Sequence, residues 1–416
     1  MLNYIIRFFK STFLFSLIAI LSCGNTNSKS EKKDKKINES QLAISKKEKE
    51  IEVGANQTEQ YLPLLQHKRV GLLGNQSSLL KQKNGNYIHL VDSLLALQVD
   101  LKKVFAPEHG FRGNADAGEI IANGKDPKTG LPVISLYGSH KKPTPEQLKD
   151  IDILIFDLQD VGARFYTYIS SLHYVMEACA ENNIPLLVFD RPNPNEHYID
   201  GPILEKKYKS FVGMHPVPIV HGMTIGEYAQ MINGEGWLKN HIKCDLKIIK
   251  MNNYTHHKKY SLPVKPSPNL PNDKAINLYP SLCFFEGTTI NAGRGTNKQF
   301  QVYGSPFLNP DLFPYSYTPK SMHGAKHPKH LGVKCYGEDL STTAFLDKIN
   351  LKWLIKAYKN TNNKSNFFTN FFIKLAGTKK LQEQIENGLT AEKIRKSWQP
   401  GLEKFKEKRQ GYLLYP

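Results

Sequence analysis

The segment Ile151–Leu158, IDILIFDL, decides the fold class of this chain of 416 residues. It is apolar at almost every position and lacks the alternation of a half-exposed strand, so it predicts a strand buried on both faces. Directly after it, Phe165–Asn182 has apolar residues at helical spacing, and Pro185–Phe189 is a second short apolar run. A strand, a helix and a strand at this spacing indicate a parallel sheet with helices on both faces.

The same alternation continues in both directions along the chain. Further predicted strands are Val70–Gly74, Leu101–Ala106, Pro132–Leu136 and Cys244–Asn252. Further predicted helices are His89–Gln98, a segment that begins at Pro145 behind the cap Thr144, and Thr224–Gly234, where Thr224 and Glu227 have the spacing of a capping box. The order of these elements predicts an α/β fold with a mainly parallel sheet.

A proline-rich segment, Lys265–Asn272 (KPSPNLPN), follows the last predicted strand. It is too rich in Pro for a strand or a helix, and we interpret it as a domain boundary and a rigid binding loop. We therefore expect a sheet domain over residues 56–262 and a smaller, basic α/β domain over residues 263–416. Helical spacing recurs in the second domain at Leu346–Tyr358, Phe367–Leu375 and Leu389–Trp398.

The N-terminus predicts an export signal. Basic residues precede the apolar run Phe13–Leu21, and the sequence Ile20-Leu21-Ser22-Cys23 follows the pattern of a bacterial lipoprotein signal. We expect residues 1–23 to be that signal, with lipidation of Cys23 and a cell-envelope location; a plain signal peptide and an N-terminal membrane anchor are the alternatives. Residues 24–55 are rich in Lys, Glu, Ser and Asn and predict a disordered tether.

The formal net charge of +18 favours an anionic environment or substrate, such as an acidic cell-wall polymer. Nucleic acid is not expected, because the Lys excess lies mainly in the N-terminal arm and the last hundred residues and no nucleic-acid-binding motif is present. The later cysteines form no CxxC pair, which argues against a zinc ribbon. The Gly-rich segment Asn291–Gln301 lacks the GxxxxGK spacing of a nucleotide loop.

The first candidate site is Val104–Glu119, VFAPEHGFRGNADAGE. Pro107 ends the predicted strand, and Glu108, His109 and Arg112 follow in a loop punctuated by glycines. An acid, an imidazole and a guanidinium at the end of a strand lie where an open α/β sheet places its chemistry. The alternative is that Glu108 caps the next helix and pairs with Arg112.

Carboxylates also follow two other predicted strands. Asp157 and Asp160 close Ile151–Leu158, and Asp190 closes Pro185–Phe189. Because the carboxyl ends of parallel strands share one edge, we expect these acids to converge with Glu108 at a crevice. The alternative is that each is a helix cap or a turn former.

Ten motifs then occur in order: FAPEHGFRG, ADAGE, LPVISLYG, DILIFDLQDVGARFYTY, VFDRPNPN, DGPIL, VGMHPVPIVHGMTIGEYA, VKPSPNLPN, YPSLCFFEGT and GRGT. Together they resemble the exo-β-N-acetylmuramidase family, also called NamZ or YbbC-like, over roughly residues 68–416. The resemblance implies a Rossmann-like domain, a smaller C-terminal domain and a cleft between them. It implies release of N-acetylmuramic acid from the non-reducing end of peptidoglycan fragments, without a metal or other cofactor. Asn195-Glu196-His197 departs from an expected Gly-rich turn.

The resemblance implies that Glu108 is the catalytic acid, since glycoside hydrolysis needs a carboxylic acid to protonate the leaving oxygen. His109 is a candidate to hydrogen-bond this acid or the sugar. Asp190 and Asp157 are candidates for the general base, and the 2-acetamido group of the sugar is another candidate for the attacking group. Retention and inversion both remain open.

Muramic acid carries a lactyl carboxylate, which a planar guanidinium binds with two parallel hydrogen bonds. Arg164 is favoured for this role because it precedes the long helix, and Arg191 and Arg294 are the alternatives; all three could instead pair with nearby acids. Further candidate substrate-binding residues are Arg112, Glu119, Tyr166, Asn193, His221, Asn269 and Glu286.

Two other functions are compatible with the sequence. A non-catalytic surface lipoprotein that captures wall fragments would use the same tether and cleft. A metal-dependent phosphoesterase or deacetylase would use His109, His215 and His221, although no HExxH frame supports it.

Overall fold

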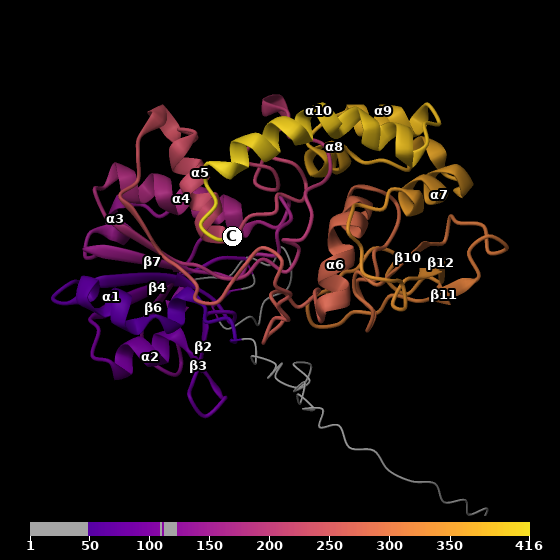
Figure 1. Cartoon of the computed structure of the whole chain (residues 1–416). Coiled ribbons are helices and arrows are strands. Elements are labelled where there is room, and N and C mark those ends of the chain that lie inside the picture. Colours follow the sequence, from indigo (N-terminus) through magenta and orange to yellow (C-terminus); the bar gives the residue numbers. More distant parts are fainter. Residues whose placement is uncertain (1–48, 109, 112–122) are drawn as a thin grey trace, which may run out of the picture. The chain divides into compact units, whose positions relative to one another are not determined.

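The structure, a computed structural model, describes residues 49–108, 110–111 and 123–416, and its main element is a seven-stranded sheet (Figure 1). In spatial order the strands are β5 (Gly124–Lys125), β6 (Pro132–Ser135), β4 (Leu101–Ala106), β1 (Val70–Gly74), β7 (Ile153–Asp157), β8 (Leu186–Phe189) and β9 (Leu246–Ile249). All neighbours are parallel except β5 and β6. The parallel strands follow the Rossmann order 3-2-1-4-5-6, which confirms the predicted fold class.

Strand β7 is buried on both faces, as its sequence predicts. Leu154 and Phe156 join one hydrophobic core, and Ile153 and Ile155 join the other. Figure 1 shows α4 and α5 on one face of the sheet and α1 and α2 on the other. The helices of this region are α1 (Thr58–Leu65), α2 (Leu90–Ala96), α3 (Pro145–Leu148), α4 (Tyr168–Glu181) and α5 (Ile225–Gly234). Each large apolar side chain buried here stabilises the sheet by roughly 1.5–3 kcal/mol.

Two helix caps are also confirmed. Thr144 and Gln147 form a capping box at α3, and Thr224 and Glu227 form one at α5. Each box satisfies two backbone N–H groups that would otherwise lack a partner at the start of the helix. A small hairpin, β2 (Leu79–Lys81) and β3 (Tyr87–His89), lies between β1 and α2 in the chain.

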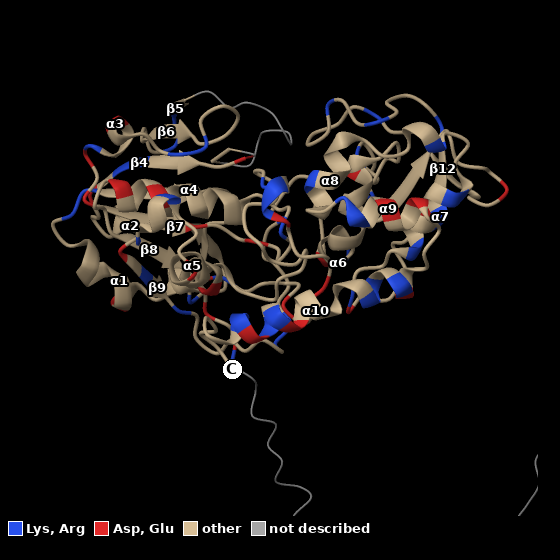
Figure 2. Ribbon diagram, turned by 90° about the horizontal axis from the view of Figure 1, so that it is seen from above, with Lys and Arg blue, Asp and Glu red and all other residues tan. Residues whose placement is uncertain are grey.

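The C-terminal region combines helices with a three-stranded antiparallel sheet. Its elements are α6 (Asp273–Leu282), η5 (Cys283–Gly287), β10 (Val302–Ser305), β11 (Tyr315–Tyr317), β12 (Cys335–Asp339), α7 (Lys352–Asn360), α8 (Asn370–Ala376), α9 (Lys380–Glu386) and α10 (Ala391–Gln410). Helix α10 begins after Thr390, as predicted, but runs well past Trp398 and through Pro400. Burial of Trp398, Leu402 and Phe405 continues its apolar face across the proline. Figure 2 shows Lys and Arg interspersed with Asp and Glu along this helix.

Both ends of the described chain pack onto the sheet domain. Tyr415 Oη donates to Asp190 Oδ2 at 2.6 Å, and the backbone N–H of Leu414 donates to Glu227 Oε1 at 2.8 Å. Val53 and Ala55 are buried, so residues 53–55 belong to the fold and not to the predicted tether. Gly54 is required there, because a Cβ would lie 2.3 Å from the carbonyl oxygen of Ile249.

Across the residues that the structure describes, no helix has both the length and the apolar character needed to cross a bilayer. The predicted signal, Cys23 and residues 24–48 of the predicted tether lie outside these residues.

Candidate active site

Glu108 lies two residues beyond β4, after Pro107 has ended the strand ladder. Its half-buried carboxylate accepts hydrogen bonds from Tyr137 Oη at 3.1 Å and from Thr167 Oγ1 at 3.0 Å. Tyr137 follows β6, and Thr167 is the N-cap of α4, so three segments at the carboxyl edge of the sheet meet at this carboxylate. One hydroxyl on each carboxylate oxygen fixes the orientation of the group.

Glu108 lines a pocket at the carboxyl edge of the sheet. Small-molecule sites occur preferentially at this edge of open α/β sheets. Other segments that line it are the start of α4, the proline-rich loop and the C-terminal region. The remaining lining residues are Phe165, Tyr166, Thr167, Tyr168, Ser267, Asn269, Leu270, Tyr279, Arg294 and Phe300.

Arg294 is the basic residue among these lining residues. Its Nε is 3.1 Å from both Oε1 and Oε2 of Glu286, and its guanidinium lies 5.2 Å from the ring centroid of Phe300. Burial disfavours its charge, but the Glu286 carboxylate outweighs this and raises the pKa of Arg294 above its ordinary value. The side chain is 23 % exposed, which leaves the guanidinium accessible from the pocket.

Tyr166 and Asn269 also reach the pocket, with different roles. Tyr166 donates to Pro266 O at 2.9 Å and packs edge-on against Tyr168. Its side chain therefore contacts mainly other residues of the pocket wall. Asn269 donates to Gly324 O at 2.7 Å, while its buried Oδ1 has no hydrogen-bond partner among the described residues. That oxygen is therefore suited to accept a hydrogen bond from a sugar hydroxyl.

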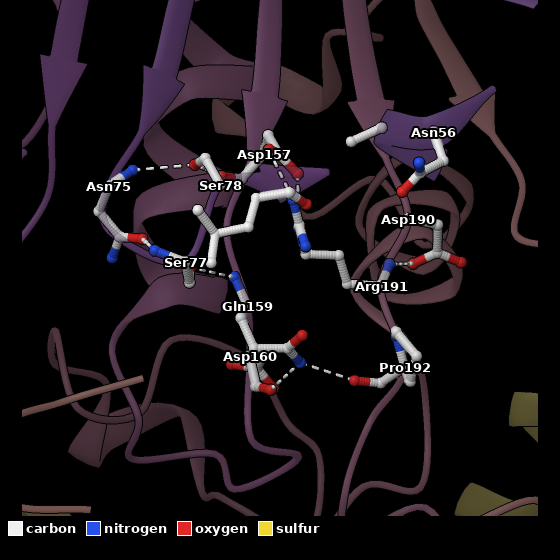
Figure 3. Close-up of polar contacts among 12 residues, drawn as sticks. Asn56, Asn75, Ser77, Ser78, Asp157, Gln159, Asp160, Asp190, Arg191 and Pro192 are labelled. Carbon is white, nitrogen blue, oxygen red and sulfur yellow. Dashed lines mark hydrogen bonds and ion pairs between the residues drawn. The ribbon is translucent and has the colours of Figure 1, made fainter. Parts of the chain in front are cut away.

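The predicted general base Asp157 is not available for that role. It is fully buried, and Arg191 donates to it in a bidentate pair, from Nε at 2.6 Å and from Nη2 at 2.8 Å (Figure 3). The same pair removes Arg191 from the candidates for the lactyl carboxylate. A buried bidentate ion pair is a structural tie between the ends of β7 and β8.

Asp190 is likewise committed to the protein interior. Its carboxylate accepts from the backbone N–H of Gly226, from Thr224 Oγ1 and from Tyr415 Oη. Burial raises the pKa of Asp190 to about 7, against the opposing effect of the Tyr415 hydrogen bond. Asp190 thus anchors α5 and the C-terminus. Asp157 and Asp190 follow parallel strands on the same edge as Glu108, but neither lines the pocket of Glu108.

The crevice between β1 and β7 is occupied by a polar network of the protein (Figure 3). Ser78 Oγ donates to Asp157 O at 2.6 Å, and Gln159 Nε2 donates to Pro192 O at 2.7 Å. Asn75 Nδ2 donates to Tyr168 Oη at 2.6 Å, which links this network to the wall of the pocket. Rossmann-like folds bind dinucleotides at the corresponding pair of strands. In this protein the polar network lies there, and the pocket acid Glu108 follows the neighbouring strand β4.

Arg164, the favoured residue for the lactyl carboxylate, is fully buried. Its guanidinium donates to four backbone carbonyl oxygens at 2.7–3.1 Å, two in the sheet domain and two at the end of α8. A group with all of its terminal donors used inside the fold is not available to a substrate. The prediction for Arg164 is therefore corrected to a structural role.

Two further predicted residues are also internal. Asn193 Nδ2 donates to Met223 O at 3.0 Å and its Oδ1 accepts from the backbone N–H of Asn195, which is the turn-forming alternative. His221 is fully buried, with its Nε2 3.6 Å from Asp160 Oδ2. The predicted site residues His109, Arg112 and Glu119 lie outside the described residues.

Sequence reasoning missed several residues of the site. Tyr137 and Thr167 hold Glu108, and Ser267 and Phe300 line the pocket. Tyr137 follows a predicted strand at the same edge as Glu108, which is a signal that could have identified it. The contribution of Phe300 depends on the tertiary fold and has no local signal.

A cluster of two acids and a histidine, Glu196, Glu227 and His256, has the spacing of metal ligands. His256 already contacts both carboxylates, with its Nε2 2.9 Å from Glu227 Oε1, and Arg409 Nη2 lies 3.1 Å from Glu196 Oε1. A guanidinium in the first contact shell opposes a second cation. Glu196, the departure from the expected turn, therefore belongs to an internal ion-pair network.

The histidines predicted for a metal-dependent enzyme also have other partners. His215 Nε2 lies 2.9 Å from His173 Nδ1, and its Nδ1 lies 3.1 Å from Tyr228 Oη. His215 is buried and stacks on Trp237 with 4.6 Å between ring centroids. These contacts indicate a packed internal pair.

The fold and the site define a two-domain α/β protein with a pocket that is lined by a glutamate, which two hydroxyl groups orient. The family model "Exo-beta-N-acetylmuramidase NamZ, N-terminal" matches residues 70–274, and the C-terminal model of the same family matches residues 277–415. The chain therefore belongs to the exo-β-N-acetylmuramidase NamZ family, as the motifs predict.

Individual relatives agree with this assignment. The chain is 40% identical over 376 residues to the peptidoglycan β-N-acetylmuramidase NamZ of Bacillus subtilis strain 168, covering 85% of this chain and 89% of that protein. Two DUF1343 family proteins of Bacteroides fragilis NCTC 9343, known from crystal structures, are similar in fold. One is 47% identical with a TM-score of 0.81 and the other 28% identical with a TM-score of 0.74; each comparison covers 88% of this chain and 99% of the other.

Proposed function

We propose that this protein is a peptidoglycan exo-β-N-acetylmuramidase, a glycoside hydrolase that removes terminal N-acetylmuramic acid from the non-reducing end of wall fragments. The observation that carries the proposal is Glu108 in its pocket, within a chain that belongs to the NamZ family. A capture protein needs a pocket but no acid held in a fixed orientation. The two hydroxyl donors to Glu108 therefore favour the enzyme.

In this mechanism Glu108 protonates the glycosidic oxygen as the bond to the anomeric carbon breaks. Glu108 is the one carboxylate among the described residues that line the pocket. Asp157 and Asp190 are committed elsewhere, so we assign the attack on the anomeric carbon to the 2-acetamido oxygen of the substrate. The resulting oxazolinium is then opened by water, and Glu108 takes the proton of that water.

The test of the acid is Glu108→Gln, assayed on the natural disaccharide of N-acetylmuramic acid and N-acetylglucosamine. We expect kcat/KM to fall by at least about 100-fold, because general acid catalysis contributes roughly 10²–10⁴. An unchanged rate would assign Glu108 a structural role. Binding of muramic acid by wild-type protein without any release would instead support the capture protein.

The test of the acetamido group changes the substrate and leaves the protein intact. In a 2-trifluoroacetamido muramide the fluorines withdraw electrons from the attacking oxygen, and we expect kcat/KM to fall steeply. A carboxylate nucleophile would not be weakened by this change. A trifluoroacetamido substrate cleaved as fast as the parent would therefore contradict substrate assistance.

For the lactyl carboxylate we propose Arg294, which the carboxylate of Glu286 orients, and for a sugar hydroxyl we propose Asn269. Two charge-assisted hydrogen bonds each contribute roughly 1.5–3 kcal/mol, so Arg294→Ala should lower kcat/KM on the muramide by at least about 100-fold. Activity on the matching glucosaminide, which lacks the carboxylate, should change little. Arg69→Ala is the control, since Arg69 pairs with Asp152 on the surface; an equal loss on both sugars in Arg294→Ala would remove Arg294 from this role.

We also propose that the protein is a lipoprotein of the cell envelope, lipidated at Cys23 and tethered by the Lys-rich segment after it. The order of charged, apolar and small residues before Cys23 supports this proposal. Metabolic labelling with a fatty acid should mark the wild type and not Cys23→Ser. Equal labelling of both would overturn it.

A further inference from the structure

Three half-buried aromatic residues, Tyr137, Tyr174 and Phe211, form an aromatic shelf beside Glu108. Phe211 stacks on Tyr174 with 6.2 Å between ring centroids and 20° between ring planes, and it lies 6.5 Å from Tyr137. The residues come from the loop after β6, from α4 and from the loop around Ser210–Gly213. Lys141 extends the shelf, with its Nζ 5.2 Å from the ring centroid of Phe211.

The shelf and the pocket contact different oxygens of Glu108. Tyr137 donates to Oε1, whereas Thr167, which lines the pocket, donates to Oε2. None of the three shelf residues lines the pocket. Tyr174 follows Thr167 by seven positions, so the two residues lie about 10 Å apart along α4 at 1.5 Å per residue.

The catalytic acid must lie at the glycosidic oxygen, between the sugar that is released and the sugar that leaves. If the pocket holds the terminal muramic acid, the leaving glycan continues from Glu108 on the side away from the pocket. The shelf lies at the oxygen of Glu108 that faces Tyr137. Half-buried aromatic rings expose part of their apolar surface, against which the C–H face of a pyranose packs.

We propose that the aromatic shelf is the binding site for the leaving glycan, an inference that rests on the proposed muramidase function. Its first N-acetylglucosamine residue packs on Phe211 and Tyr174. The next residue of a wall glycan is a muramic acid with a lactyl carboxylate, and Lys141 supplies a cation for it. The protein then selects glycan chains over single muramides through contacts on both sides of the acid.

The test compares two substrates that differ only in the leaving group. One is the muramic acid–N-acetylglucosamine disaccharide, and the other is β-N-acetylmuramyl fluoride, whose leaving group is a single atom. Phe211→Leu and Tyr174→Leu keep apolar volume and remove the ring face. We expect each to lower kcat/KM on the disaccharide by about tenfold, through KM, and to leave the fluoride rate unchanged. The fluoride rate also reports that the variants are folded.

Phe371→Leu is the matched control, because Phe371 is an exposed phenylalanine on α8 at 39 % exposure and should change neither rate. Lys141→Ala should weaken the preference for a tetrasaccharide over the disaccharide. Equal losses on both substrates, or no loss on the disaccharide, would contradict the proposed role of the aromatic shelf. Neither result would contradict the proposed muramidase function. A wild-type protein that hydrolyses neither substrate would overturn the proposed function and the shelf with it.

Discussion

Replacing Arg164 by Met separates a structural arginine from a substrate-binding one. The guanidinium donates to Pro202 O, Val217 O, Leu375 O and Ala376 O, which joins the start of α4 to the end of α8. Loss of a donor costs about 2 kcal/mol for each buried acceptor, or about 8 kcal/mol in total. Burial lowers the pKa of Arg164 to about 9, which means that the buried charge destabilises the fold by about 5 kcal/mol. Replacement by Met removes this cost. We therefore expect a net loss of about 3 kcal/mol.

The assay is urea denaturation of the purified protein followed by fluorescence. A loss of about 3 kcal/mol corresponds to a midpoint lower by roughly 1 M, at a slope near 3 kcal/mol/M. Below the transition, the ratio of muramide to glucosaminide hydrolysis should equal that of the wild type. Arg69→Met is the control and should lose less than about 1 kcal/mol, since its ion pair is exposed. Unchanged stability together with a lost preference for the muramide would refute the structural role.

Three further predictions test the site and its surroundings. Tyr137→Phe should lower kcat on the disaccharide about tenfold and affect the muramyl fluoride less, because a fluoride leaving group does not need the proton of Glu108. Burial opposes the charge of His256, but its hydrogen bonds to Glu196 and Glu227 raise its pKa to about 9. The protonated His256 should therefore stabilise the folded protein by at most about 3 kcal/mol. This stabilisation should be complete below about pH 6.5 and lost as the pH rises through 9, as measured by thermal unfolding. Excess chelator should change neither activity nor Tm.

Each of these predictions has an outcome that contradicts it. Equal losses on both substrates in Tyr137→Phe would indicate damage to the pocket and not to the acid. His256→Gln is the control for the pH series and should unfold with a flatter pH dependence than the wild type; an equally steep curve would assign the effect to another group. A chelator-sensitive activity that zinc restores would reopen the metal-dependent enzyme.

The fold was largely predictable because its signals are local. Strand β4 has the predicted bounds Leu101–Ala106, and the apolar residues of β7 divide between two cores as a doubly covered strand requires. The caps at Thr144 and Thr224 depend on side chains three residues away. The full length of α10 was not predictable from Pro400, because its stability comes from tertiary burial of the residues on either side.

The site was predictable only in part, because a charged residue at the end of a strand can contact a substrate or can form ion pairs and hydrogen bonds inside the fold. Glu108 and Arg294 meet at the pocket, as residues of the expected site. Asp157, Asp190 and Arg164 have the same sequence features but are used inside the fold. Their partners are up to 225 residues away in the chain, as for Asp190 and Tyr415, and local sequence carries no information about them.

The return of the C-terminus to the sheet domain affects the order in which the protein matures during synthesis. All seven strands of the main sheet are complete once residue 249 has been made. Asp190, however, lacks its hydrogen bond from Tyr415 until residue 415 has been made, 166 positions later than the last strand. Until residue 415 is available, a nascent sheet domain therefore carries a carboxylate that lacks one of its hydrogen-bond donors.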